Sequence, residues 1–164
     1  MLQLAKLDDI EAIDELALCV IQHMIDSEIP QWTLAYPRKE HFIPDIMEQS
    51  CYIYKVDGKI LGSCTILPEN DPPYRTIHSW IKDHSLVMHR VLVHPEHQKQ
   101  GIAKMFIDQA IQLAKASGYE SIKIDTHLEN YKMRRFLQKN GFIELEYLTV
   151  IDRMAYELVL EDLL

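Results

Sequence analysis

The feature that most constrains the fold is a strand, a short loop and a helix in the middle of the chain. Residues 86–93 form a near-continuous apolar run, as expected for a central strand covered on both faces. Gly101 ends the loop that follows, and apolar residues then recur at helical spacing from Ile102 to Ser117. A buried strand that leads through a short loop into a helix predicts an α/β fold.

The loop Gln98-Lys99-Gln100-Gly101-Ile102-Ala103 indicates an anion site. The first amides of a helix have no intrahelical partner, and the helix dipole adds partial positive charge at the same end. A phosphate group is favoured there. Gly101 and Ala103 are small enough for a phosphate to approach the backbone, and Lys99 and Lys104 add charge. Taken alone, the loop is equally compatible with an ordinary turn between a strand and a helix.

Periodicity and turn residues predict the remaining elements. Strands are expected at 2–6, 51–56, 59–67, 121–126, 142–151 and 154–160, and helices are expected up to Asp26, at 39–49 and at 130–139. Asp57-Gly58 between two apolar runs indicates a hairpin, and Asp8 with Glu11 fits a capping box for the first helix. This order predicts a mixed sheet with antiparallel strands first and parallel strands in the centre.

Composition limits the classes of function. A chain of 164 residues suits one domain over residues 1–164, and a net charge of −8 argues against broad binding to nucleic acid or to an anionic membrane. The same charge is compatible with cationic acceptors such as amines. Three widely spaced cysteines indicate a reducing, cytoplasmic setting, and no apolar run is long enough for a signal peptide or a membrane span. The histidine spacings fit no metal motif, so no metal is expected.

Two motifs together resemble those of the GNAT superfamily of N-acetyltransferases. The first is Leu92-Val93-His94-Pro95 followed by Gln98-x-x-Gly101-x-Ala103, and the second is Asn130 followed by Lys139-Asn140-Gly141-Phe142. Both occur in the family's order and spacing, over residues 86–142. The resemblance implies the GNAT fold, in which the strands at 86–93 and 121–126 splay apart around acetyl-CoA. It also makes a homodimer one possible assembly.

The resemblance further implies which residues bind the cofactor. A backbone amide near Leu92 or Val93 would donate to the thioester carbonyl, and amides from Gln98 to Ala103 would bind the diphosphate. Asn130 and Met133 would lie along the pantetheine or the diphosphate. The full expected set is Val91, Leu92, Val93, Gln98, Lys99, Gln100, Gly101, Ile102, Ala103, Lys104, Asn130 and Met133.

His89 is the candidate general base, because histidine titrates in the useful range and some family members carry a histidine at this position. The alternative is a histidine that packs or faces solvent. The glutamate of the histone-acetylating branch corresponds to Val87, and the tyrosine that often serves as general acid corresponds to Leu137. Tyr131, His127, water or unaided departure of the thiolate could replace that acid. His127 is better explained as a residue that shapes the helix start at Asn130.

The acceptor is expected near the first helices and the loop that precedes residue 86. Gln31, Trp32, Tyr36 and Trp80 are the candidate binding residues, since aromatic faces suit cationic or apolar groups. Packing against the core explains them equally well. The sequence thus predicts transfer of an acetyl group from acetyl-CoA to a primary amine of a small molecule or peptide, by direct attack in a ternary complex. A non-catalytic coenzyme A sensor and an enzyme for longer acyl groups are the alternatives.

Overall fold

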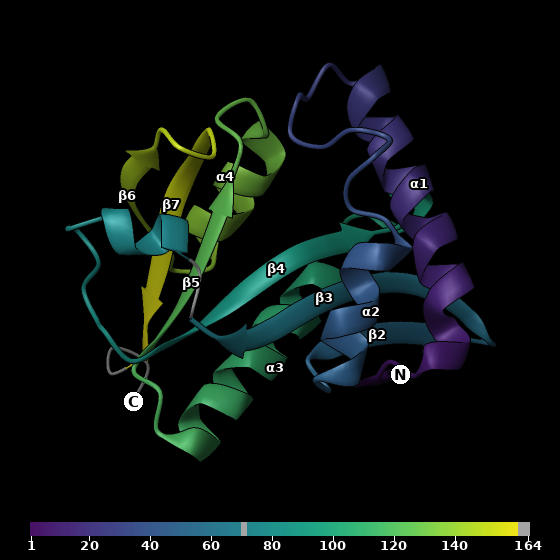
Figure 1. The fold of residues 1–164 in the computed structure, drawn as a ribbon, viewed down its shortest axis with the longest axis horizontal. Helices are drawn as coiled ribbons and strands as arrows, with labels where there is room; N and C mark the ends of the chain where they lie inside the picture. The colour runs from purple at the N-terminus through teal and green to yellow at the C-terminus, as the bar shows by residue number, and fades with distance from the viewer. Residues whose placement is uncertain (70–71, 161–164) are drawn as a thin grey trace. The chain divides into compact units, whose positions relative to one another are not determined.

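The computed structural model describes residues 1–69 and 72–160, and they form two compact units (Figure 1). Unit 1 holds Met1–Ile66 and His89–Gln109, and unit 2 holds Leu67–Met88 and the chain from Ala110 onward. The strands follow the order β1-β2-β3-β4-β5-β7-β6. Antiparallel pairs and one parallel pair both occur, so the mixed α/β class is confirmed. A single functional domain over residues 1–164 stays a prediction.

Unit 1 is built on an antiparallel meander. Its strands are β1 (Leu2–Leu4), β2 (Cys51–Val56) and β3 (Lys59–Pro68), which leaves the unit after residue 66. Asp57 and Gly58 connect β2 to β3 with φ values of 50° and 77°. Positive φ at both positions is what a two-residue hairpin turn requires, so the predicted hairpin is confirmed.

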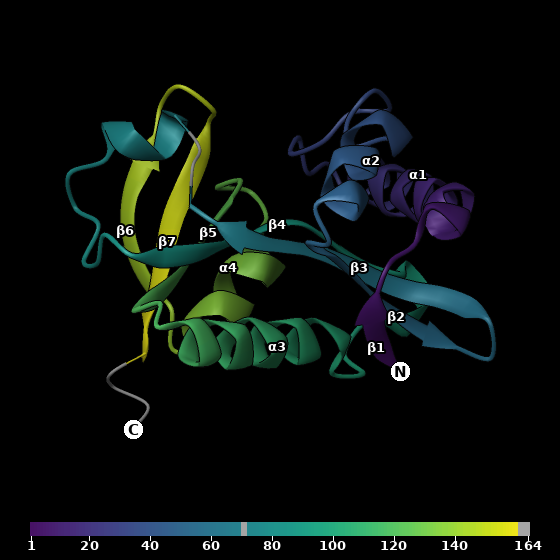
Figure 2. The ribbon, with the colours of Figure 1, turned by 60° about the horizontal axis from the view of Figure 1, so that its bottom comes forward.

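Helices cover both faces of this meander. Figure 2 shows α1 (Ile10–Asp26) and α2 (Lys39–Met47) on one face of β2 and β3, and the start of α3 (Ile102–Ser117) on the other. The first face buries an apolar cluster that includes Ile13, Phe42 and Ile53. On the second face, a Cβ placed on Gly62 would lie 2.6 Å from Cγ2 of Ile102. Gly62 therefore allows α3 to lie close against β3.

Unit 2 contains the parallel pair. The first residues of β4 (Ser85–Val93) run parallel to β5 (Ser121–Thr126), and β5 pairs antiparallel with β7 (Arg153–Val159), which pairs with β6 (Ile143–Leu148). The helix α4 (Tyr131–Lys139) precedes β6. A separate apolar cluster forms around the buried Tyr74 of the 3-10 turn Pro72–Thr76.

Several boundaries differ from the sequence predictions, most clearly at the start of α1 and in the closing hairpin. A 3-10 turn, Leu7–Asp9, precedes α1, and the side chain of Asp9 accepts a hydrogen bond of 2.8 Å from the amide of Lys6. The predicted capping box of Asp8 and Glu11 is therefore wrong, because the extra turn moves the capping carboxylate to Asp9. The closing hairpin is also shorter than predicted, since residues 149–152 form the turn.

Among the helices in residues 1–69 and 72–160, none has both the length and the apolar character that crossing a bilayer requires.

Candidate active site

The loop before α3 has an open face. Lys99 and Gly101 have φ values of 63° and 81°, and no heavy atom lies within 4 Å of the position where a Cβ on Gly101 would stand. The amide of Met105 donates to the carbonyl of Gly101 at 3.1 Å, which starts the hydrogen bonding of the helix. The amides of the three residues before Met105 thus belong to the first turn, where the helix offers them no acceptor.

The side chains of this loop differ in their surroundings. Lys99 and Lys104 are both exposed, and the ammonium of Lys104 lies 2.7 Å from a carboxylate oxygen of Asp108. Gln100 contacts the ring of His97 at 3.1 Å, and Ile102 is buried and anchors the helix start. Free amides, an open approach to Gly101 and a nearby ammonium group fit an anionic diphosphate. The residues in this part of unit 1 are therefore suited to the phosphate end of coenzyme A.

The second half of β4 brings the candidate base and the candidate carbonyl donors onto one strand. His89 is half-buried, and burial together with the positive charge of Arg90 lowers the pKa of His89 to about 4. Its imidazole is consequently neutral at pH 7. Leu92 is fully buried, while Val91 and Val93 are half-buried. The strand end is secured to β3, because the amide of His94 donates to the carbonyl of Leu61 at 2.8 Å.

An ion pair that the sequence analysis missed lies beside His89. Arg90 donates from Nε and Nη2 to the two carboxylate oxygens of Asp45 on α2, at 2.8 Å each, and from Nη1 to the hydroxyl of Tyr36 at 3.2 Å. Asp45 also accepts a hydrogen bond of 2.7 Å from the hydroxyl of Thr65 on β3. A charged residue inside a largely apolar strand was the available signal, although its partner on α2 could not be read from the chain.

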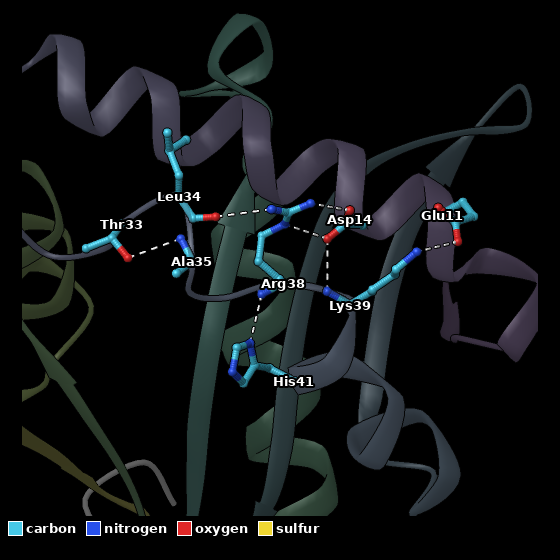
Figure 3. A network of polar contacts seen from close by, with 8 residues as sticks. All are labelled: Glu11, Asp14, Thr33, Leu34, Ala35, Arg38, Lys39 and His41. Atoms are coloured by element: carbon cyan, nitrogen blue, oxygen red, sulfur yellow. Dashed lines mark hydrogen bonds and ion pairs between the residues drawn. The ribbon is translucent and has the colours of Figure 1, made fainter.

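The segment between α1 and α2 is held against α1 by a polar network (Figure 3). The buried carboxylate of Asp14 accepts two hydrogen bonds of 2.9 Å from the guanidinium of Arg38 and one of 2.9 Å from the amide of Lys39. The hydrogen bonds from Arg38 are the main reason why the pKa of Asp14 is lowered. Arg38 also donates to the carbonyl of Leu34 at 3.1 Å, so that one side chain ties this loop to the helix.

Three candidate acceptor residues precede Arg38 in unit 1. Trp32 is partly buried and packs against the apolar cluster, and Gln31 is half-buried. Tyr36 is 38% exposed. Its ring and the imidazole of His41 are in an edge-to-face contact, with ring centres 4.5 Å apart. Tyr36 is thus an exposed aromatic group beside Arg90, and its predicted role in acceptor binding stays a prediction.

Trp80, the fourth candidate acceptor residue, belongs to unit 2. Its indole N–H donates to the carbonyl of Tyr74 at 2.7 Å, and the ammonium group of Lys123 lies 4.5 Å from the ring centre. These contacts give Trp80 a packing role within unit 2, while acceptor binding by its ring stays a prediction.

The start of α4 in unit 2 is shaped by two residues. Asn130 is buried and caps the helix, since its side-chain oxygen accepts from the amide of Met133 at 3.3 Å. His127 accepts from the amide of Glu129 through Nδ1 at 3.1 Å, and its carbonyl accepts from the amide of Asn130 at 3.0 Å. The interpretation that His127 shapes this helix start is confirmed. The cofactor contacts predicted for Asn130 and Met133 stay predictions.

The position of the usual family acid is filled by a core residue. Leu137 is completely buried in unit 2, so this position offers neither a proton donor nor access to solvent. Tyr131, one of the proposed substitutes, is 59% exposed at the first position of α4.

Known proteins resemble this chain in sequence and in fold. The model of the acetyltransferase (GNAT) family matches residues 21–142. Human N-acetyltransferase 8 is 29% identical over 94 residues, which are 57% of this chain and 38% of that protein, so the chain spans well under half of that relative. A GNAT-family acetyltransferase from Streptococcus agalactiae has the same fold, with a TM-score of 0.84, 22% identity and coverage of 97% of this chain and 94% of its own. The PaiA N-acetyltransferase of Thermoplasma acidophilum, solved in complex with coenzyme A, follows with a TM-score of 0.76, 16% identity and coverage of 97% and 98%. Because the family match extends over most of the chain, this protein belongs to the GNAT family of acetyltransferases.

Proposed function

We propose that the protein is an acetyl-CoA-dependent N-acetyltransferase that acts on a primary amine of a small molecule or peptide, by direct attack in a ternary complex. The observation that carries the proposal is the open loop at the start of α3, where Gly101 has a positive φ and leaves its face free. Family membership and the coenzyme A complex of the Thermoplasma relative support the same cofactor.

The cofactor would be bound by backbone groups more than by side chains. Amides from Gln98 to Ala103 would bind the diphosphate, and an amide near Leu92 or Val93 would donate to the thioester oxygen, where negative charge develops. Acetyl-CoA supplies an activated acetyl group and a thiolate that can leave. Asn130 and Met133 of unit 2 keep the cofactor role that the family resemblance implies.

His89 would take the proton that the amine loses. With a pKa of about 4, the imidazole is neutral and can accept a proton at physiological pH, but it is too weak a base to deprotonate a free alkylammonium ion directly. The amine must therefore arrive with its lone pair free. Its N–H becomes more acidic as the new C–N bond forms, and at that stage a weak base is sufficient. No acid is required at Leu137, because a thiolate is a tolerable leaving group.

Calorimetry with acetyl-CoA tests the cofactor site. Gly101→Glu places a carboxylate where the diphosphate would bind, and binding should weaken by roughly 100-fold or more through charge repulsion and loss of space. Gly58→Glu is the matched control, because Gly58 lies in the same unit with a φ of 77° and an equally open Cβ direction. A folded wild-type protein that does not bind acetyl-CoA would remove the transferase assignment.

Turnover separates the enzyme from a coenzyme A sensor. Acetyl-CoA consumption is measured with 2-phenylethylamine, spermidine and a lysine-containing tripeptide as acceptors. For the acceptor that reacts, His89→Gln should lower kcat by roughly 10²-fold, the usual contribution of a general base, and leave acetyl-CoA binding unchanged. Binding of acetyl-CoA without turnover of any of the three amines would favour the sensor.

A further inference from the structure

Strand β4 contains a residue in an unfavourable backbone conformation. Arg90 has a φ of 50°, in the left-handed region that residues with a Cβ rarely adopt. The burial of the strand changes at the same place, since residues 85–88 are all buried and residues 89–91 are all half-buried. A strained residue inside a strand persists only when the surrounding contacts hold it.

The side chain of Arg90 supplies these contacts. Its bidentate pair with Asp45 is largely withdrawn from solvent, with 17% of the arginine side chain and 8% of the aspartate side chain exposed. The hydroxyl of Thr65 donates a further hydrogen bond to Asp45. The pair thus connects α2, β3 and β4 within unit 1. Arginine suits this place better than lysine, because only its planar group can make two parallel hydrogen bonds and still reach a third acceptor.

The third acceptor is Tyr36, which belongs to the segment expected to bind the amine. That segment is fixed at its other end by Arg38, which is bonded to Asp14 on α1. Tyr36 is therefore held between two ion pairs, one on α1 and one on β4. Arg90 also follows His89 directly, so a shift of the backbone at residue 90 would alter the direction of the neighbouring imidazole.

We infer that Arg90 is a positioning residue: its ion pair with Asp45 holds the left-handed turn of β4 and joins Tyr36, on the acceptor side, to the strand that carries His89. The inference rests on the proposed function insofar as it concerns catalysis. The claim that Arg90 places the rings of His89 and Tyr36 does not depend on turnover.

Arg90→Gly separates the two roles of this residue. Glycine adopts a positive φ without strain, so the variant keeps the turn and removes only the side-chain contacts. Asp45→Asn weakens the ion pair with Arg90 by removing the charge on α2. Tyr36→Phe removes only the hydrogen bond between the Tyr36 hydroxyl and Arg90. Lys55→Gln is the control, because Lys55 and Asp9 form another partly buried ion pair of unit 1, with an N–O distance of 3.0 Å.

The first readout needs no activity. Nuclear magnetic resonance of the His89 imidazole and the Tyr36 ring, in protein well below the melting temperature and at pH 8, where the imidazole is neutral with or without the charge of Arg90, should show shifted signals in Arg90→Gly and Asp45→Asn and unchanged signals in Lys55→Gln. Loss of general stability alone would not produce this pattern. Wild-type ring signals in Arg90→Gly would overturn the inference, even if no acceptor were found.

The second readout is kinetic and uses the amine that reacts among the three acceptors above. Arg90→Gly should lower kcat/KM for the amine by roughly 10- to 100-fold, the range expected for lost charge-assisted hydrogen bonds, while acetyl-CoA binding stays at the wild-type value. Tyr36→Phe should raise KM for the amine and change kcat little. Arg90→Lys should restore only part of the loss. Wild-type kcat/KM in Arg90→Gly would contradict the positioning role, whereas wild-type protein that turns over no amine would contradict the proposed function instead.

Discussion

At the scale of single residues, His89 shows how burial and a neighbouring charge act together. Both favour the neutral imidazole, and the resulting pKa of about 4 lies well below the ordinary value of 6.5. Between these two values the unfolded chain binds a proton that the folded protein does not. Folding stability therefore decreases as the pH falls from about 6.5 toward 4 and is retained above that range.

The difference between the pKa values of His89 in the folded and unfolded chain predicts that stability depends on pH. The free energy of unfolding in urea should fall by up to about 3 kcal/mol on acidification because of His89 alone, since each pKa unit corresponds to ~1.4 kcal/mol. The decrease should be clearly smaller in His89→Gln than in the wild type. His78→Gln, at an exposed histidine, should behave like the wild type. Parallel curves for wild type and His89→Gln would show that His89 titrates normally.

At the scale of elements, Gly62 decides how closely α3 lies against β3. A methyl group there would meet Ile102 at 2.6 Å, Phe106 at 3.1 Å and the carbonyl of Leu92 at 3.2 Å. Two of these neighbours belong to α3, the helix that follows the loop proposed to bind the diphosphate. The position is therefore important for the site as well as for the core.

Gly62→Ala should destabilise the protein by about 1–3 kcal/mol, the usual cost of overpacking a core, and should also weaken acetyl-CoA binding by displacing the start of α3. Chemical unfolding and calorimetry measure the two effects. Gly58→Asn is the comparison, because asparagine tolerates the left-handed conformation and the space beside Gly58 is open. Equal stability of the two variants would mean that α3 can move away at little cost.

The elements themselves were largely predictable, because their signals are local. Asp57-Gly58 specified a hairpin, and the periodicity after Gly101 specified a helix that ends before Gly118, where φ is 78°. The capping box was predicted wrongly because a 3-10 turn adds residues before α1, and turns of this kind have no strong periodic signal. The left-handed residue in β4 was not predicted, because nothing local favours that conformation for arginine.

At the scale of the whole molecule, the net charge of −8 should affect the acceptor kinetically. Cationic amines are attracted to an acidic protein over distances comparable with the Debye length, and salt screens this attraction. At saturating acetyl-CoA, kcat/KM for spermidine should fall several-fold between 20 mM and 500 mM salt, whereas an arylamine that is neutral at pH 7.5 should change little. The same salt response for both acceptors would exclude electrostatic steering by the protein.

The sequence by itself determined the mixed α/β class, the strand–loop–helix unit with Gly101 and the family. These features depend on residues close together in the chain, where periodicity, a glycine or a short motif is sufficient. Only the tertiary structure decided which distant residues meet: Asp45 with Arg90, Asp14 with Arg38, and Gly62 with Ile102. The residues of these pairs lie 24 to 45 positions apart in the chain, and their contacts depend on how the elements pack. The environment of His89 was also decided by the tertiary structure. Its low pKa results from burial and from the guanidinium of Arg90, which Asp45 on α2 holds in place.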